Sequence, residues 1–295
     1  MLLEIAVADS YGIAFEFVKD PASHNLKNDL TFQQNPRYHD LLPSQYTDDT
    51  LRSIATWRVI SLGGKLTSAP FNPTLYAHAI KTEFLRDKRA GWSKKFQAYL
   101  QQSEDIGETA LDFMRGISTR AESNGSIMGS LPCGFLQHPV DVRLAAAAQA
   151  VSTHSAATIP YAQAMALAAH FHIYDLGKRD ELSDFLWDEV EGYDQAFDLS
   201  ASPQPVDMTA KQTATAVLHL LEGGKSLTGI MTEAVNVGGD TDSVAALAVG
   251  IASCCDEYDQ DIPQHLIEQL DQGGEWGAGY LRALDEQMLA YKLSG

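Results

Sequence analysis

The stretch from Val235 to Ala252, VNVGGDTDSVAALAVGIA, constrains the fold more than any other part of the chain. Asp240 and Asp242 stand one residue apart, directly before a run of small apolar residues with helical spacing. Such a run predicts a buried helix. Two carboxylates at the start of a buried helix are unfavourable unless something compensates their charge. The fold therefore has to supply a partner for these two aspartates.

Most of the remaining sequence also predicts helices. The segments rich in Ala, Leu, Gln and Glu, which are strong helix formers, are residues 141–152, 160–174, 211–223 and 263–272. Sustained alternation of Val, Ile and aromatic residues is almost absent, so we expect no important strands. Residues 19–46 are polar and punctuated by proline, which indicates a long irregular connection of the kind that is usually functional or disordered. Because nothing marks a linker, we predict one all-α domain over residues 1–295.

The charge balance argues against two classes of partner. The 295 residues include 39 acidic and 21 basic side chains, for a formal net charge of −18. Nucleic acid and anionic membrane surfaces need clustered Lys and Arg, so neither is expected. The N-terminal MLLEIAVADSYG lacks the basic start of a signal peptide. No run approaches the roughly 20 apolar residues of a membrane span, and the odd cysteine count does not make a disulfide framework. We therefore expect a cytoplasmic protein.

A second acidic cluster stands near the other end of the chain. In QYTDDTLRSIA, residues 45–55, Thr47, Asp48, Asp49 and Thr50 again precede an amphipathic helix. One interpretation is helix capping, since Asp, Ser and Thr are preferred N-cap residues and acids suit the positive end of the helix dipole. Capping needs only one oxygen, however, and here two carboxylates with neighbouring hydroxyls occur at two separate helix starts.

The alternative interpretation is a shared metal site. If the two helix starts converge, four nearby negative charges repel one another strongly. A hard divalent cation such as Mg²⁺ or Ca²⁺ prefers carboxylate, hydroxyl and water oxygens. The absence of a neighbouring Cys or His pair disfavours zinc. The two clusters lie far apart in the sequence, and their spacing does not decide between capping and a metal.

The order of these motifs resembles one known family. TDDT (47–50) followed by GGDTDS (238–243) is similar to the motifs of the ADP-ribosylglycohydrolases, which include dinitrogenase reductase-activating glycohydrolases and ADP-ribosyl-acceptor hydrolases. Further similar segments, in the family's order, are AVADSYGIAFEF (6–17), SEDIGETAL (103–111), SNGSIMGSLPCGFL (123–136) and Thr153-His154. The resemblance covers nearly the whole chain. It implies a single-domain orthogonal helical bundle with two Mg²⁺ ions that Mn²⁺ could replace. We expect the protein to be a monomer.

The resemblance also assigns a metal-binding role. The residues it implies as metal ligands are Thr47, Asp48, Asp49, Asp240, Asp242 and Ser243. Ser243 stands where many members have threonine, and either hydroxyl can coordinate. Among the implied catalytic residues Glu16, Asp48 and Asp242, Glu16 acts as general base on the attacking water. Bound Mg²⁺ polarises ribose hydroxyls and lowers the pKa of water, while the distal ribose carbon develops oxocarbenium character.

The substrate side follows from the same resemblance. Asn124, Gly125 and Met128 line the ribose and phosphate side, and His154 contacts the substrate. Glycine-rich backbone, here at Gly238 and Gly239, supplies N–H donors for a diphosphate. Asp105 is either a second acid near the substrate or a helix start, and for Asp9 we expect a structural role, capping or holding a loop.

The implied function is hydrolysis of the bond between ADP-ribose and an acceptor, either a protein side chain such as Arg or Ser or a small-molecule conjugate. A non-catalytic, crystallin-like relative is the alternative of another class, although disuse erodes ligands and every expected acid is present here. Departures from the family pattern are Gly129, where many relatives carry arginine, and Glu4 and Ala8, where glycines are common. They lie off the implied metal ligands and bear on which acceptor is recognised.

Overall fold

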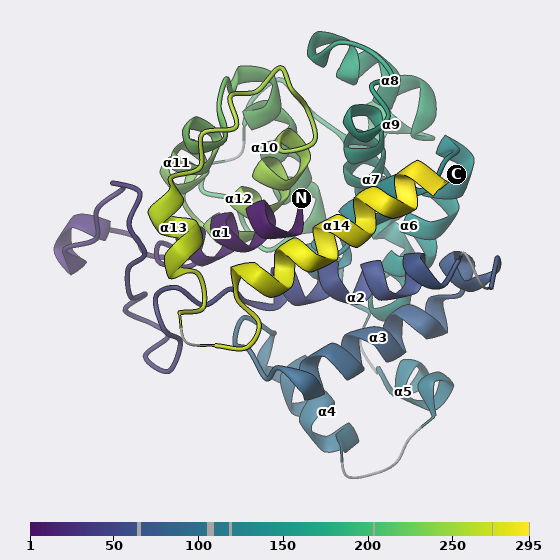
Figure 1. Cartoon of the computed structure of the whole chain (residues 1–295), viewed down its shortest axis with the longest axis horizontal. Coiled ribbons are helices and arrows are strands. Elements are labelled where there is room, and N and C mark those ends of the chain that lie inside the picture. The colour runs from purple at the N-terminus through teal and green to yellow at the C-terminus, as the bar shows by residue number, and fades with distance from the viewer. Residues whose placement is uncertain (64–65, 105–108, 118–119, 203, 273, 295) are drawn as a thin grey trace.

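The computed structural model describes residues 1–63, 66–104, 109–117, 120–202, 204–272 and 274–294. Within these residues the chain is helical (Figure 1), with isolated β-bridges but no sheet, so the predicted all-α fold is confirmed. The α-helices are α1 (Leu2–Gly12), α2 (Asp48–Leu62), α3 (Pro73–Arg86), α4 (Lys94–Glu104), α5 (Ala110–Gly116), α6 (Pro139–Thr153), α7 (Ile159–Ile173), α8 (Leu182–Glu189), α9 (Tyr193–Ala196), α10 (Ala210–Gly223), α11 (Leu227–Val237), α12 (Thr241–Ala252), α13 (Gln264–Gln269) and α14 (Ala278–Ser294). The 3₁₀ helices are η1 (Pro21–His24), η2 (Ala69–Phe71), η3 (Asn124–Ser126), η4 (Leu131–Phe135), η5 (Ala156–Thr158) and η6 (Arg179–Glu181).

Helices α1 and α12 pack together at the centre of the molecule (Figure 1). Every residue of α12 is buried, and so is nearly all of α1, as expected for helices that are covered on all sides. Small residues let the two helices approach closely. A Cβ added at Gly12 would lie 2.6 Å from Asp242 Cα, and one added at Gly250 would lie 2.6 Å from Ile5 Cγ1. The end of α1 therefore lies beside the start of α12.

Helix α2 begins at the same place. It packs on α1 and α3 and also contacts α12. Its N-cap is Thr47, whose hydroxyl accepts a hydrogen bond from the amide of Asp49. The carboxylate of Asp9, on α1, accepts hydrogen bonds from Thr47 and Thr50. The first turn of α2 is thereby held against α1, close to the start of α12.

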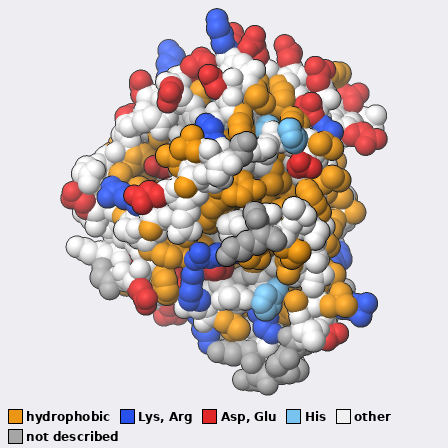
Figure 2. Space-filling view, turned by 45° about the vertical axis from the view of Figure 1, so that its right-hand side comes forward, with side chains coloured by type: hydrophobic (Ala, Val, Ile, Leu, Met, Phe, Trp, Pro, Cys, Tyr) orange, Lys and Arg blue, Asp and Glu red, His pale blue; other side chains and the backbone are white. Residues whose placement is uncertain are grey.

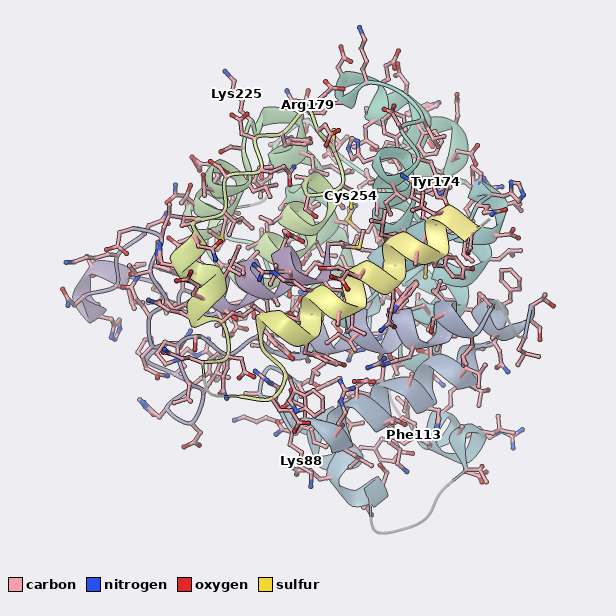
Figure 3. The ribbon with its side chains drawn as sticks, in the orientation of Figure 1. Lys88, Phe113, Tyr174, Arg179, Lys225 and Cys254 are labelled. Carbon is pink, nitrogen blue, oxygen red and sulfur yellow. The ribbon has the colours of Figure 1, made fainter. Side chains whose placement is uncertain are left out.

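The remaining helices enclose this centre. Helix α14 crosses over α1 and α2, whereas α10 and α11 pack on α12, and α7 packs on α6 and α12 (Figure 1). Helices α4 and α5 form an outer layer on α3, where Phe113 is fully buried (Figure 3). On the face in Figure 2, acidic side chains spread along the upper edge and basic ones are fewer and scattered. No helix in the described ranges is long and apolar enough to cross a membrane.

The helices predicted over 141–152, 160–174 and 211–223 correspond to α6, α7 and α10. The helix predicted over 263–272 is shorter, because α13 ends at Gln269. Asp271 has a positive φ of 49°, its amide donates to the Ser44 carbonyl, and its carboxylate binds Arg89 at 2.9 Å. These tertiary contacts override the helix propensity of the segment. Residues 19–46 are irregular apart from η1, as predicted.

The two glycines before α12 allow a direct stability test. Gly238 and Gly239 have positive φ values of 72° and 84°, where a side chain costs about 1–3 kcal/mol. A Cβ at Gly239 would also lie 1.9 Å from the carbonyl oxygen of Val206, whereas the nearest atom to one at Gly238 is Pro205 Cβ, at an ordinary contact distance of 3.8 Å. We therefore expect Gly239→Ala to lower the free energy of unfolding clearly more than Gly238→Ala. Urea unfolding of both variants measures the difference, and equal losses would contradict this packing.

Candidate metal and substrate site

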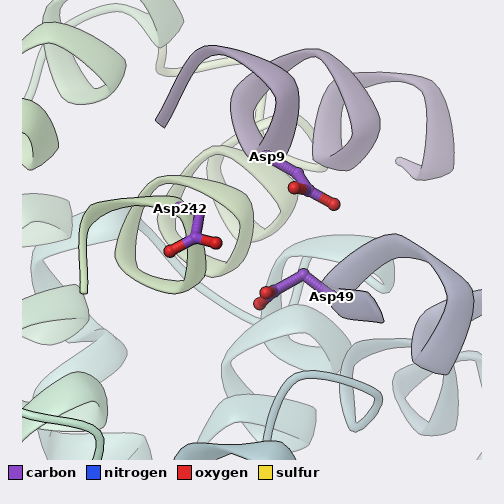
Figure 4. A group of neighbouring side chains, drawn as sticks. All are labelled: Asp9, Asp49 and Asp242. Carbon is purple, nitrogen blue, oxygen red and sulfur yellow. The ribbon is translucent and has the colours of Figure 1, made fainter. Parts of the chain in front are cut away.

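Carboxylates from three helices meet where α1, α2 and α12 converge (Figure 4). Asp9, Asp49 and Asp242 each place one carboxylate oxygen within 4.8 Å of the others. Ser243 Oγ donates to Asp49 Oδ2 at 3.3 Å, which links residues 194 positions apart in the sequence. The structure thus brings the two acidic motifs together at one place, with the end of α1 beside them.

A second group of acids shares one member with the first. Glu16, Asp240 and Asp242 also hold one carboxylate oxygen each within 4.8 Å of the others. Glu16 lies in the turn after α1, where the amide of Phe17 donates to the carbonyl oxygen of Gly239 at 2.7 Å. This bond ties the turn after α1 to the turn before α12. Asp242 is therefore common to both groups.

These acids are buried without the partners that buried charges need. Asp49 Oδ1, Asp242 Oδ1 and Glu16 Oε2 are buried and have no hydrogen-bond partner. Burial, reinforced by the charges of neighbouring carboxylates, raises the pKa of Asp49 and of Asp242 well above the usual range. Burial and then the charge of Asp240 raise the pKa of Glu16 to about 8, although a hydrogen bond from Tyr38 opposes the shift.

A hard divalent cation fits this donor set. Unpartnered carboxylate oxygens within a few ångströms of one another are what Mg²⁺ or Ca²⁺ coordinates, and a bound cation removes the mutual repulsion. Neither group found among the described residues contains a histidine or cysteine, which disfavours zinc. The chain therefore holds acidic clusters that could bind metal.

Asp48 lies beside these groups and not within them. Arg52 Nε donates to Asp48 Oδ2 at 3.3 Å. The other carboxylate oxygen faces Gly91, where an added Cβ would lie only 2.2 Å from it. Burial raises the pKa of Asp48 to about 6, and the charge of Arg52 opposes this shift. Asp48 thus forms an ion pair with the guanidinium of Arg52, and no such ion pair is seen for Asp49 or Asp242 among the described residues.

Comparison with known proteins decides the family. The family model described as ADP-ribosylglycohydrolase matches residues 1–293. The chain belongs to the ADP-ribosylglycohydrolase family. It is 27% identical over 291 residues to the ADP-ribosyl-(dinitrogen reductase) glycohydrolase of Rhodospirillum rubrum, covering 91% of this chain and 88% of that protein. An uncharacterized protein of Archaeoglobus fulgidus is 25% identical over 276 residues, 85% of this chain and 84% of its own length. The solved structure titled ADP-ribosylglycohydrolase-related protein complex matches the fold with a TM-score of 0.72 at 19% identity, covering 99% of this chain and 96% of that one.

The residues that the family resemblance assigned to the substrate side adjoin the acidic groups. Asn124 Nδ2 donates to Asp240 Oδ2 at 3.1 Å. Gly125 packs against His154 and Arg52, because an added Cβ would lie 2.9 Å from His154 Nε2 and 3.3 Å from Arg52 Cζ. Burial lowers the pKa of His154 well below its usual range, and the charges of nearby arginines lower it further. His154 is therefore neutral at pH 7.

The segment after Gly125 runs along α2. The Met128 carbonyl accepts from Ser53 Oγ at 2.9 Å. A Cβ at Gly129 would lie 2.8 Å from the Arg52 carbonyl oxygen. Gly129 thus allows a close approach of α2. Asp105 lies outside the described residues, and its two predicted alternatives stay open.

Two further residues at this site, Arg52 and Tyr38, lie outside the motifs that the sequence marks. Arg52 follows Asp48 by one helical turn, and this i,i+4 spacing of opposite charges at the start of an apolar helix is a signal that could have found it. Tyr38 contacts Glu16 from the irregular segment over 19–46, and no local pattern marks it. Both contribute polar groups beside the carboxylates.

A substitution of Asp9 can distinguish whether this acid has a structural role or binds a metal. Its carboxylate accepts four hydrogen bonds from the amides and hydroxyls of Thr47 and Thr50, at 2.6–3.2 Å, which supports the structural role expected from the sequence. Asp9→Ala would leave these buried donors without an acceptor and should lower the free energy of unfolding by at least about 2 kcal/mol. The loss should be similar in Mg²⁺ and in EDTA.

The matched control for this prediction is Asp20→Ala, which removes the exposed side-chain cap of η1. We expect it to change the stability by no more than about 0.5 kcal/mol. Chemical unfolding with and without Mg²⁺ measures both variants. A loss for Asp9→Ala that appears only with Mg²⁺ would assign Asp9 to the metal instead.

Proposed function

We propose that this protein is a Mg²⁺-dependent hydrolase that cleaves the glycosidic bond between ADP-ribose and an acceptor and releases ADP-ribose. The observation that carries the proposal is the pair of buried acid groups that share Asp242. Membership of the ADP-ribosylglycohydrolase family supports the reaction class. The name of the R. rubrum relative supports an ADP-ribosylated protein as one kind of substrate.

The shared aspartate supports two cation positions. One would be held by Asp49 and Asp242, with the hydroxyls of Thr47 and Ser243 nearby, and the other by Asp240 and Asp242. Asp48 would complete the ligand set from the Arg52 side. When bound, Mg²⁺, or Mn²⁺ in its place, would polarise ribose hydroxyls and lower the pKa of a neighbouring water molecule.

Glu16 is the proposed general base. Its raised pKa of about 8 lies close to neutrality, the range in which a carboxyl group exchanges protons efficiently. Its unpartnered Oε2 atom can accept a proton from an attacking water molecule. The ring of neighbouring carboxylates would stabilise the positive charge that develops at the distal ribose carbon.

The substrate would extend from the acid groups toward Asn124 and His154. Asn124 holds Asp240 in place and faces the same groups, and His154 lies across Gly125. The Gly238 amide already donates to the Val235 carbonyl at 3.2 Å, so the backbone at Gly239, which precedes the positive N-terminus of α12, is the proposed source of an N–H donor for the diphosphate.

The test is a panel of defined substrates: proteins carrying ADP-ribose on arginine, proteins carrying it on serine, and small ADP-ribose conjugates. Each is assayed for released ADP-ribose with Mg²⁺, with Mn²⁺ and with EDTA. We expect release from at least one class with either metal and none in EDTA. Full activity in EDTA would overturn the metal requirement, and no release from any class would support a non-catalytic relative. The class that reacts identifies the acceptor.

A further inference from the structure

Arg52 is a buried cation inside an acidic site. Its side chain is 5% exposed, and its guanidinium lies over the ring of Trp92 at 4.8 Å and over that of Phe96 at 5.4 Å. Its only carboxylate partner among the described residues is Asp48, bound through Nε. The aromatic rings fix the plane of the guanidinium, so its remaining N–H groups point in set directions.

One of these N–H groups begins a chain of hydrogen bonds that leads to His154. Arg52 NH1 donates to Thr153 Oγ1 at 3.5 Å, Thr153 Oγ1 lies 2.8 Å from His154 Nδ1, and His154 Nε2 lies 3.1 Å from Ser123 Oγ. A guanidinium has no acceptor atom. Thr153 Oγ1 therefore accepts from Arg52, which leaves its hydroxyl hydrogen free to point to His154 Nδ1. Because the hydroxyl oxygen has a second lone pair, the reverse bond, from a protonated Nδ1, is the alternative that the histidine tautomer distinguishes. A neutral histidine that accepts at Nδ1 carries its hydrogen on Nε2.

We propose that Arg52 is a positioning residue that orients the Thr153 hydroxyl and so fixes His154 as the tautomer protonated at Nε2. Through its bond to Asp48, which lies beside the acid groups, the same side chain connects that edge of the groups to the substrate side of the site. The effect on catalysis rests on the proposed function, whereas the tautomer itself does not. Gly125 allows His154 and Arg52 to lie close to the backbone at residue 125, because a side chain there would come too close to both.

The tautomer gives His154 a defined chemical role. Nε2 presents an N–H group, and not a lone pair, toward Ser123 and the Asn124 segment. A substrate oxygen that replaces the Ser123 hydroxyl would find a neutral donor already in place. Preorganised donors of this kind are set by outer hydrogen bonds, whose loss typically costs about 10–100-fold in activity or affinity.

The test is ¹⁵N nuclear magnetic resonance of the histidine side chains in the full-length protein, with the His154 signals assigned by their loss in His154→Gln. Wild type should show hydrogen on Nε2 and a hydrogen-bonded, unprotonated Nδ1. Thr153→Val removes the central hydroxyl without changing charge, and should move the Nδ1 resonance to that of an unbonded ring nitrogen. Arg52→Met should move it in the same direction, and Thr153→Ser should restore the wild-type position.

Hydrogen on Nδ1 in the wild type, or an unmoved Nδ1 resonance in either Thr153→Val or folded Arg52→Met, would overturn the proposal. Thr153→Val carries the test if Arg52→Met does not fold, because Arg52→Met leaves Asp48 buried without its partner. On an accepted substrate, Thr153→Val should raise KM about 10–100-fold with a smaller change in kcat. Resonance shifts in a protein without hydrolase activity would sustain the role of Arg52 and reject the proposed function.

Discussion

Asp242→Asn should abolish release of ADP-ribose while making the metal-free protein more stable. Asp242 is the acid common to both groups, and its Oδ1 atom is buried without a partner. Burial and the charges of Glu16, Asp240 and Asp49 all raise the pKa of this carboxyl. In the absence of metal, replacing the acid by a neutral amide relieves that repulsion. With metal, the same change removes a ligand, so kcat/KM should fall by at least about 100-fold, the upper range for outer ligand partners.

The measurement pairs a kinetic assay with thermal unfolding in EDTA. Asp188→Asn, an exposed acid on α8, is the matched control and should change neither quantity. A role of Asp242 that was only structural would lower both activity and stability. Opposite signs for the two effects are the signature of a functional acid held in an unfavourable environment.

Mg²⁺ should stabilise the wild-type protein more at high pH than at low pH. At an Mg²⁺ concentration 100 times Kd the gain is about 2.7 kcal/mol, or roughly 5 °C or more in Tm for a chain of this size. The metal binds ionised carboxylates, so at lower pH it has to displace protons. Asp242→Asn should lose most of this gain at every pH.

The sign of the pH effect in EDTA follows from the raised pKa values. Glu16 shifts from 4.5 to about 8 and Asp48 from 3.8 to about 6. Between the unfolded and folded pKa values, the folded state binds more protons than the unfolded chain, so these groups reduce stability as pH rises. Buried histidines act oppositely: the pKa of His172 is lowered to about 4, which makes stability rise with pH between about 4 and 6.5.

Thermal unfolding of wild type and Asp242→Asn at matched pH isolates the raised pKa of Asp242, because the histidines, Glu16 and Asp48 are common to both proteins. The difference in stability, variant minus wild type, should grow from pH 5 to pH 8 in EDTA. A difference that is flat or shrinks over this range would contradict the raised pKa values at the site.

The sequence predicted what local patterns control. Helical periodicity and composition located α6, α7, α10 and α12, because buried faces repeat along a single helix. The acidic motifs at residues 47–50 and 238–243 pointed to two helix starts, because capping residues and metal ligands occupy the same local positions. Family resemblance then joined the two motifs into one expected site.

Contacts between distant segments were out of reach of the sequence. Asp49 and Asp242 meet because Gly12 lets α1 pack directly on the start of α12. A single glycine in a sequence does not predict that another helix packs closely against it. The orientation of Asp48 toward Arg52 depends on the Trp92 and Phe96 rings that hold the guanidinium. The end of α13 depends in the same way on the contact between Asp271 and Arg89. Helix propensities describe single residues and cannot predict this contact.

The central claim is that the two acidic motifs form one divalent-cation site. The most direct measurement is a crystal structure of the full chain grown with Mn²⁺, with anomalous scattering used to locate the metal. We expect anomalous peaks for Mn²⁺ ions coordinated by Asp49, Asp240 and Asp242. If two ions bind, Asp242 should contact both of them. Crystals of Asp242→Asn should show no peaks at these positions. Crystals of the wild type grown at saturating Mn²⁺ in which these carboxylates coordinate no metal would contradict the claim.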